Sequence, residues 1–339
     1  RFGREIEIGA APFDSEFFID GPAKLVFALL DAETRRLLID VKAEVGLEID
    51  QGEIKTVLPR GRNVPGALPL LLEVRKRFAP PVEIPRRLAG NAGQDPEPGV
   101  RLHNLLLLIR ELPGDPWTAE ALRKACSDPV PEIRLRAARA LGDAGRGVLL
   151  ELAEGLLDDA ASAEAVSALE GELPFERTRA ILEGALSRRH VLTARVCMEA
   201  ISRGGGPAAV EVLARVLEQE TGYLAPTAAR ALGATGSPAA EPPLIAALER
   251  EEEGLRVAAA NALGRVGSVA AVLPLKELAD RFLLGDTRKA ARQAIAEIQS
   301  RVQGASPGQL SLAGVEAGQL SLADDPAGRL SLPPEERPE

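Results

Sequence analysis

The sequence AARALGATG at residues 228–236 decides the fold of this chain. Nearly the same nine residues occur as AARALGDAG at 137–145 and as AANALGRVG at 259–267. The starts of the three copies are 91 and 31 residues apart, and 91 is close to three times 31. Weaker copies begin in the gap at Ala165 and Cys197, so the sequence carries a repeat with a period near 31 residues, as stacked repeat proteins do.

Each repeat predicts two helices. The first has Ala and Leu at helical spacing and stops at a glycine, and the second is rich in Leu and often opens with Pro, which suits a first helical turn. Upstream, DPEPGVRL at 95–102 matches DPVPEIRL at 128–135. The array therefore runs from about residue 95 to 302 with seven copies of the first helix. The expected second helices span 147–157, 207–217, 238–248 and 269–282.

The unit length, the DPxxEIR opening and the AARALGxxG helix resemble HEAT repeats, most of all the short type named after phycobilisome lyases. This resemblance covers about 200 residues and implies an α-solenoid. It implies little about function, because the fold serves scaffolds, adaptors and a few enzymes.

Residues 1–79 show no such repeat and predict a small α+β domain. We expect strands at 4–8 and 17–19, a hairpin across residues 50–52, and three helices. The helices are expected at 23–30, 32–43 and 66–78. The segment 3–38 resembles an uncharacterised domain that precedes HEAT arrays in some bacterial proteins.

Two further segments differ in composition from the array. Residues 80–99 are rich in Pro and Gly and are expected to be a linker into the solenoid at 100–302. Residues 303–339 hold no long amphipathic segment and are expected to be a disordered tail. The predicted fold class is thus mainly α: a small α+β domain, an α-solenoid of HEAT-like helix pairs and a disordered tail.

The charge balance limits the partners. The 339 residues carry 50 acidic and 41 basic side chains, a formal charge of −9, which argues against nucleic-acid binding. The apolar runs are shorter than the roughly 20 residues that cross a bilayer. Protein partners are therefore expected. Two distant cysteines outside any CxxC motif fit a reducing cytosol, so a cytoplasmic location is expected.

No catalytic, metal or cofactor site is predicted. His103 and His190 each lack a ligand partner at metal-binding spacing, whereas the HEAT-type hydroxylases that bind iron need several His-Glu pairs. No GxSxG motif supplies a serine nucleophile. Cys126 and Cys197 lie among Ala and Leu and are expected to be buried small apolar residues.

Arginines recur at one repeat position. Two interpretations fit them: a structural ladder that pairs with acidic residues of the neighbouring repeat, or a stripe that binds a partner. The residues are Arg101, Arg134, Arg256 and Arg288.

The second helices conventionally line the concave face of such arrays and are the main candidates for partner binding. Their charged residues suit a basic or mixed partner. These residues are Glu151, Glu154, Glu211, Arg215, Glu218 and Glu249.

The tail holds a ten-residue repeat with Leu-Ser-Leu triplets. Two interpretations fit it: a docking motif, which apolar pairs at fixed spacing suggest, or low-complexity drift. Its candidate residues are Gln309, Leu310, Leu312, Gln319, Leu320, Leu322, Leu330 and Leu332. The QLSL copies resemble peptides that bind the bacterial sliding clamp. However, Ala313 and Ala323 replace the aromatic residue, which costs about 3 kcal/mol by analogy with a core Phe.

These observations favour a non-enzymatic scaffold or adaptor that binds protein through the solenoid surface, with a contribution from the tail. The alternatives are an enzyme or repair factor on a HEAT scaffold, of the bilin lyase or DNA glycosylase kind, and a sliding-clamp adaptor. A glycosylase needs a basic groove with aromatics for an extruded base, and the chain has one Trp and one Tyr.

Overall fold

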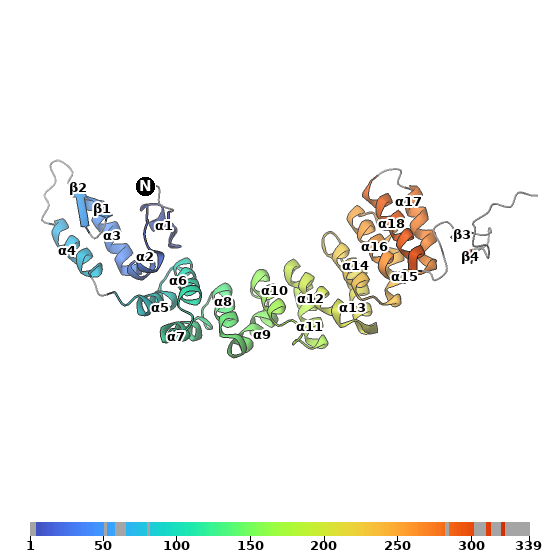
Figure 1. The fold of residues 1–339 in the computed structure, drawn as a ribbon, viewed down its shortest axis with the longest axis horizontal. Coiled ribbons are helices and arrows are strands. Elements are labelled where there is room, and N and C mark those ends of the chain that lie inside the picture. The colour runs from blue at the N-terminus through green and yellow to red at the C-terminus, as the bar shows by residue number, and fades with distance from the viewer. Residues whose placement is uncertain are drawn as a thin grey trace, which may run out of the picture. The chain divides into compact units, whose positions relative to one another are not determined.

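The computed structural model describes residues 5–50, 53–57, 66–79, 82–281, 285–301, 310–312 and 320–322. The chain forms two compact units, one reaching to Leu169 and the other starting at Glu170 (Figure 1). Both units consist of stacked helix pairs, which confirms the predicted mainly α solenoid. Within the described residues, no helix combines the length and the apolar character needed to cross a bilayer.

All seven predicted first helices are present. They are α6 (Pro98–Glu111), α8 (Pro131–Leu141) and α10 (Asp159–Ala168) in the first unit, and α12 (Val191–Gly204), α14 (Leu224–Ala234), α16 (Glu253–Val266) and α18 (Asp286–Arg301) in the second. Within each unit, successive first helices pack side by side.

The second helices alternate with them. They are α7 (Pro116–Ala125) and α9 (Arg146–Gly155) in the first unit, and α11 (Phe175–Ser187), α13 (Gly206–Gln219), α15 (Glu241–Ala247) and α17 (Val272–Arg281) in the second. Single 3-10 turns, η2 (Gly142–Gly145), η3 (Pro238–Ala240) and η4 (Val269–Ala271), lead into α9, α15 and α17.

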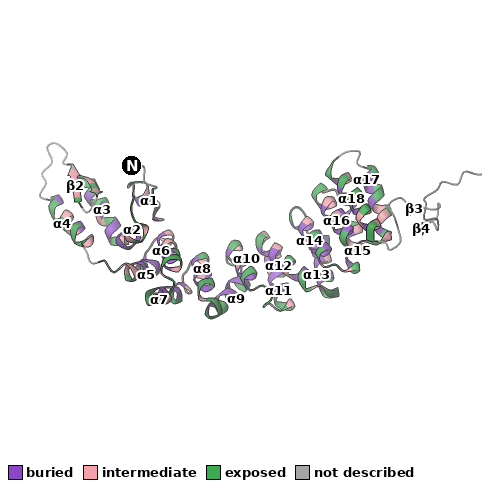
Figure 2. Cartoon of the chain, viewed as in Figure 1, coloured by how far each residue is buried: buried purple, intermediate pink, exposed green. Residues whose placement is uncertain are grey.

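Small residues let the first helices approach closely. Gly233 on α14 faces Ala262 on α16, and a Cβ atom on Gly233 would lie 2.6 Å from the Ala262 Cβ. Buried residues therefore lie along the faces where neighbouring helices pack, and exposed residues lie on the outward faces (Figure 2). The core consists mostly of Ala and Leu, as the shortage of aromatics requires.

The N-terminal region follows the prediction in part. It contains α2 (Ala23–Leu29), α3 (Ala32–Glu44), α4 (Ala67–Arg77) and a hairpin of β1 (Gly46–Asp50) and β2 (Glu53–Val57) in antiparallel register. The strands expected at 4–8 and 17–19 are wrong for the residues described there. A single ladder-like bond joins Ile6 N–H to the Ile19 carbonyl at 2.9 Å.

The segment between those expected strands contains α1 (Ala11–Asp14), a helix that was not expected from the sequence. The Asp14 carboxylate accepts hydrogen bonds from the N–H groups of Ile8, Gly9 and Ala10 at 2.9–3.0 Å. These bonds satisfy backbone donors that a strand would have paired in a ladder.

The linker expected at 80–99 is also wrong over much of its length. Residues Ile84–Gln94 form helix α5, with Pro85 in its first turn and with Leu88 and Ala92 buried. The prolines that suggested a linker are compatible with a helix at its start, because the first N–H groups need no helical acceptor.

Helix α5 makes the N-terminal region part of the array. It packs against α6 and α7, as a second helix does, and also against α2, which itself contacts α6. Helices α2 and α5 are thus the first pair of the array, with α3, the hairpin and α4 inserted between them. The core is continuous from Ile8 to Ala137, so residues 1–79 are not a domain separate from the first repeats.

The tail prediction differs from the structure at six residues. β3 (Leu310–Leu312) and β4 (Leu320–Leu322) pair antiparallel, with Leu310 opposite Leu322 and Leu312 opposite Leu320. The first two Leu-Ser-Leu triplets are therefore extended segments whose backbones pair with each other. The rest of 303–339 lies outside the described residues.

Candidate protein-binding groove

Helix α13 places three of the predicted residues on one face. It begins after Gly205, whose φ of 61° suits glycine, and has Pro207 in its first turn. Glu211, Arg215 and Glu218 follow at spacings of four and three, so they share the exposed side of the helix. The opposite side is buried through residues that include Leu213 and Val216.

This exposed face forms one wall of a groove whose other wall is α15 and the turn after it. The groove has a volume of about 490 Å³. Small or apolar residues supply most of its lining, and charged residues supply the remainder. The apolar lining is Ala214, Leu217, Pro243, Ala246 and Ala247, and the charged lining is Glu211, Arg215, Glu218 and Arg250.

Arg250 fixes the two walls relative to each other. Its guanidinium donates to the carbonyls of Leu217 and Glu220 at 2.7 and 2.9 Å, and to Glu252 at 3.0 Å. The end of α13 leaves carbonyls without helical partners, and an arginine from the next repeat supplies the missing donors. These hydrogen bonds therefore fix the position of the α15 wall against the end of α13.

The charged residues on the α13 wall differ in whether they form an ion pair. Arg215 donates to Glu211 at 3.0 Å, an exposed pair of a kind worth about 0.3–0.5 kcal/mol. Glu218 is exposed and has no ion pair among the described residues. Glu218 is thus the carboxylate on this wall that can accept hydrogen bonds from a partner.

The sequence prediction missed the α15 wall. Pro243, Ala246, Ala247 and Arg250 lie 32 residues after Glu211, Ala214, Arg215 and Glu218, so the two walls use equivalent positions of neighbouring repeats. Charged residues on the expected second helices mark only the first set, because Pro243, Ala246 and Ala247 are uncharged and Arg250 lies beyond the helix expected at 238–248. The repeat period was the signal that could have located the second set.

The other second-helix candidates lie outside this groove. Glu249 forms an exposed pair with Arg281 of α17 at 3.1 Å. Glu151 and Glu154 are exposed on α9, in the first unit. The structure thus brings together three of the six predicted second-helix residues.

The tail candidates divide in the same way. Leu310, Leu312, Leu320 and Leu322 belong to the paired strands. Gln309, Gln319, Leu330 and Leu332 lie outside the described residues.

The repeating arginine is structural at Arg101. Its guanidinium makes two bonds to Asp128, at 2.7 and 3.0 Å, and one to the Asp95 carbonyl at 2.9 Å. The hydrogen bonds that Arg101 donates to Asp128 raise the pKa of Arg101 above its usual range. Arg256 repeats the backbone part of this arrangement by donating to the carbonyls of Arg250 and Glu251.

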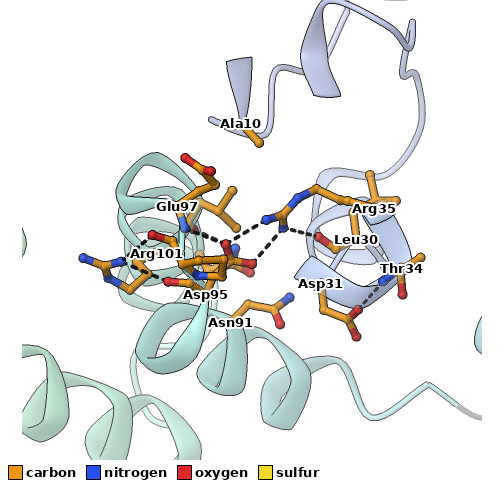
Figure 3. Close-up of polar contacts among 12 residues, drawn as sticks. Ala10, Leu30, Asp31, Thr34, Arg35, Asn91, Asp95, Glu97 and Arg101 are labelled. Atoms are coloured by element: carbon orange, nitrogen blue, oxygen red, sulfur yellow. Dashed lines mark hydrogen bonds and ion pairs between the residues drawn. The ribbon is translucent and has the colours of Figure 1, made fainter. Parts of the chain in front are cut away.

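A second buried pair was not predicted from the sequence. Arg35 on α3 donates to both carboxylate oxygens of Asp95 at 2.7 and 2.8 Å, and to the Leu30 carbonyl at 2.9 Å (Figure 3). Asp95 also accepts from the Glu97 N–H. Arg35 thus makes to the turn before α6 the same fork that Arg101 makes to the turn before α8.

The two cysteines and the candidate metal ligands give no reactive site among the described residues. Cys197 is buried, and burial raises the pKa of its thiol from 9.0 to about 12, so the reactive thiolate is suppressed. Cys126 is only half-buried, so the expectation of a fully buried residue is wrong for it, and this partial burial still raises the pKa of its thiol. The described residues contain no cluster of three His, Cys, Asp or Glu side chains able to hold a metal ion.

Comparison with known proteins supports the repeat type. Residues 218–296, which include part of the groove, match the HEAT repeats family. A search of curated proteins finds no match. The narrower resemblance to the phycobilisome-lyase type stays a prediction.

Two solved structures are similar to parts of the chain. One is human deoxyhypusine hydroxylase in complex with glycerol, at 19% identity over 63% of this chain and 95% of that chain, with a TM-score of 0.30. The other is an engineered protein, at 21% identity over 67% of this chain and 91% of that chain, with a TM-score of 0.26. Likeness at this level carries no inference about activity.

Proposed function

We propose that this chain is a non-enzymatic scaffold that binds a protein partner, and that the groove between α13 and α15 receives a segment of that partner. The groove carries the proposal, because an apolar lining bordered by a few charges is typical of binding sites. Its volume of about 490 Å³ is large enough for side chains of a docked segment.

The rigidity of the groove supports this role. Arg250 ties the turn after α15 to the end of α13, so little conformational entropy would be lost on binding. The apolar lining would supply the favourable free energy, and Glu218 would orient a donor group of the partner.

A matched pair of variants tests the proposal. Ala246→Arg fills the groove with a long charged side chain, whereas Ala234→Arg makes the same change at an exposed position of α14. Wild type and both variants are immobilised, exposed to extract of the source cell, and the retained proteins are quantified by mass spectrometry.

We expect a defined set of proteins to be retained by wild type and by Ala234→Arg, with about tenfold lower recovery on Ala246→Arg, which corresponds to ~1.4 kcal/mol. Equal recovery by all three forms would place binding elsewhere. Turnover of a small molecule by the purified chain would contradict the scaffold function itself.

A further inference from the structure

The first unit contains a second pocket, formed where the N-terminal segment passes over α2 and α6. Its volume is about 520 Å³. Phe27 of α2 and Leu107 of α6 are buried members of its lining, and Leu106 is 39% exposed beside them. The His103 ring meets the Phe27 ring edge-on at 5.7 Å. The base of the pocket is thus apolar and preformed.

Acidic residues border this apolar base. Glu5, Glu7 and Asp20 all line the pocket and are exposed. The bond from the Ile6 N–H to the Ile19 carbonyl holds the two segments that carry them next to each other. In the described part of the chain, none of the three carboxylates takes part in an ion pair.

The cations that the structure describes beside this pocket, Arg110 and Lys24, are directed toward a different carboxylate. Arg110, which also lines the pocket, donates to Glu111 at 2.8 Å, and Lys24 lies 3.5 Å from the same Glu111. The hydrogen bond from Arg110 lowers the pKa of Glu111, as expected for a carboxylate that receives both cations. Among the described residues, the three rim carboxylates therefore give the pocket a net negative rim over an apolar base.

We infer that this pocket binds a basic segment of a protein partner, in which an arginine or lysine stands beside an apolar residue. The apolar side chain enters against Phe27, Leu106 and Leu107, and the cation meets the carboxylate rim. Arginine suits the rim best, because its planar guanidinium donates two parallel hydrogen bonds to one carboxylate while its aliphatic stem packs on apolar surface. The pocket lies in the first unit, so the inference stands apart from the α13–α15 groove.

The experiment measures binding of a short capped, fluorescein-labelled peptide of alternating arginine and leucine to the full chain. Fluorescence anisotropy is recorded at physiological salt, where charges beyond about 8 Å are screened. A second peptide carries serine in place of leucine. The pocket variant is Glu7→Gln with Asp20→Asn, and its control is Glu277→Gln with Asp280→Asn on α17, which makes the same change of charge at exposed positions.

We expect saturable binding of the arginine-leucine peptide, about tenfold weaker binding by the pocket variant and unchanged binding by the control, as the loss of two partly exposed charge pairs predicts. Leu106→Ser should weaken binding of the same peptide. Equal losses in both double variants would show attraction to overall charge and would overturn the inference. Equal affinity for the serine peptide, or no saturable binding, would overturn it as well.

Discussion

Replacing Arg35 with methionine removes the charge that faces Asp95 while keeping a long side chain. The Arg35 and Asp95 side chains are only 7% and 1% exposed, and two hydrogen bonds join them. Without the guanidinium, the carboxylate stays buried with the Glu97 N–H as its remaining bond, and the Leu30 carbonyl loses a donor. Breaking one partner of such a buried pair costs about 3–5 kcal/mol.

Urea unfolding followed by Trp117 fluorescence reports this loss, because the single tryptophan of the chain lies on α7 of the first unit. For an m-value near 2 kcal/mol/M, the midpoint should fall by about 2 M. Arg36→Met is the matched control, since Arg36 is the exposed neighbour of Arg35 on the same helix; its cost should stay within about 0.5 kcal/mol.

The double variant Arg35→Met with Asp95→Leu separates the buried charge from the lost packing. It should be more stable than Arg35→Met alone, because replacing both ions by apolar groups removes the uncompensated carboxylate. A loss below about 1 kcal/mol for Arg35→Met would refute the reasoning, since it would mean that water or the rest of the chain satisfies Asp95.

Three further predictions concern the same elements. Asp128→Ala should cost about 3 kcal/mol by the same measurement, because it strands the guanidinium of Arg101, whose side chain is 9% exposed. In the native chain Cys197 should resist thiol reagents that label Cys126, and its labelling should require unfolding. Burial raises the Cys197 pKa from 9.0 to about 12, so between these pH values the thiol ionises in the unfolded chain but not in the folded one, and the free energy of unfolding should fall as pH rises. Deleting residues 1–79 should abolish cooperative unfolding of the first unit by circular dichroism, because Leu88 and Ala92 of α5 lose the α2 face; a deleted chain that unfolds at the wild-type midpoint would contradict this.

The repeat period predicted the seven first helices because their Ala and Leu positions form the contacts between neighbours. Local composition failed where tertiary packing decides the outcome. Gly90 and Gly93 lower the helix propensity of residues 84–94, yet burial of Leu88 stabilises α5 against its neighbours. A propensity argument cannot detect that stabilisation in one sequence.

The candidate site shows the same limit. Charge and helical spacing found Glu211, Arg215 and Glu218, but the opposing wall consists mainly of Pro and Ala, which have no chemical signal of their own. Arg35 and Asp95 are 60 residues apart, and Arg35 lies outside the repeats, so no period relates the two. Their pairing follows from the packing of α2 and α5, which the sequence did not show.

The interrupted first pair bears on the order in which the array forms. Neighbouring repeats need only short loops to meet, whereas the Asn91 side chain reaches the Phe27 carbonyl across 64 residues. The entropy of closing a loop rises with its length, so α6, α7 and α8 should associate first and α2 should dock afterwards. During translation helix α2 would therefore leave the ribosome long before its partner α5 has been made, and its residues Phe27, Ala28 and Leu29 would lack that packing partner until then.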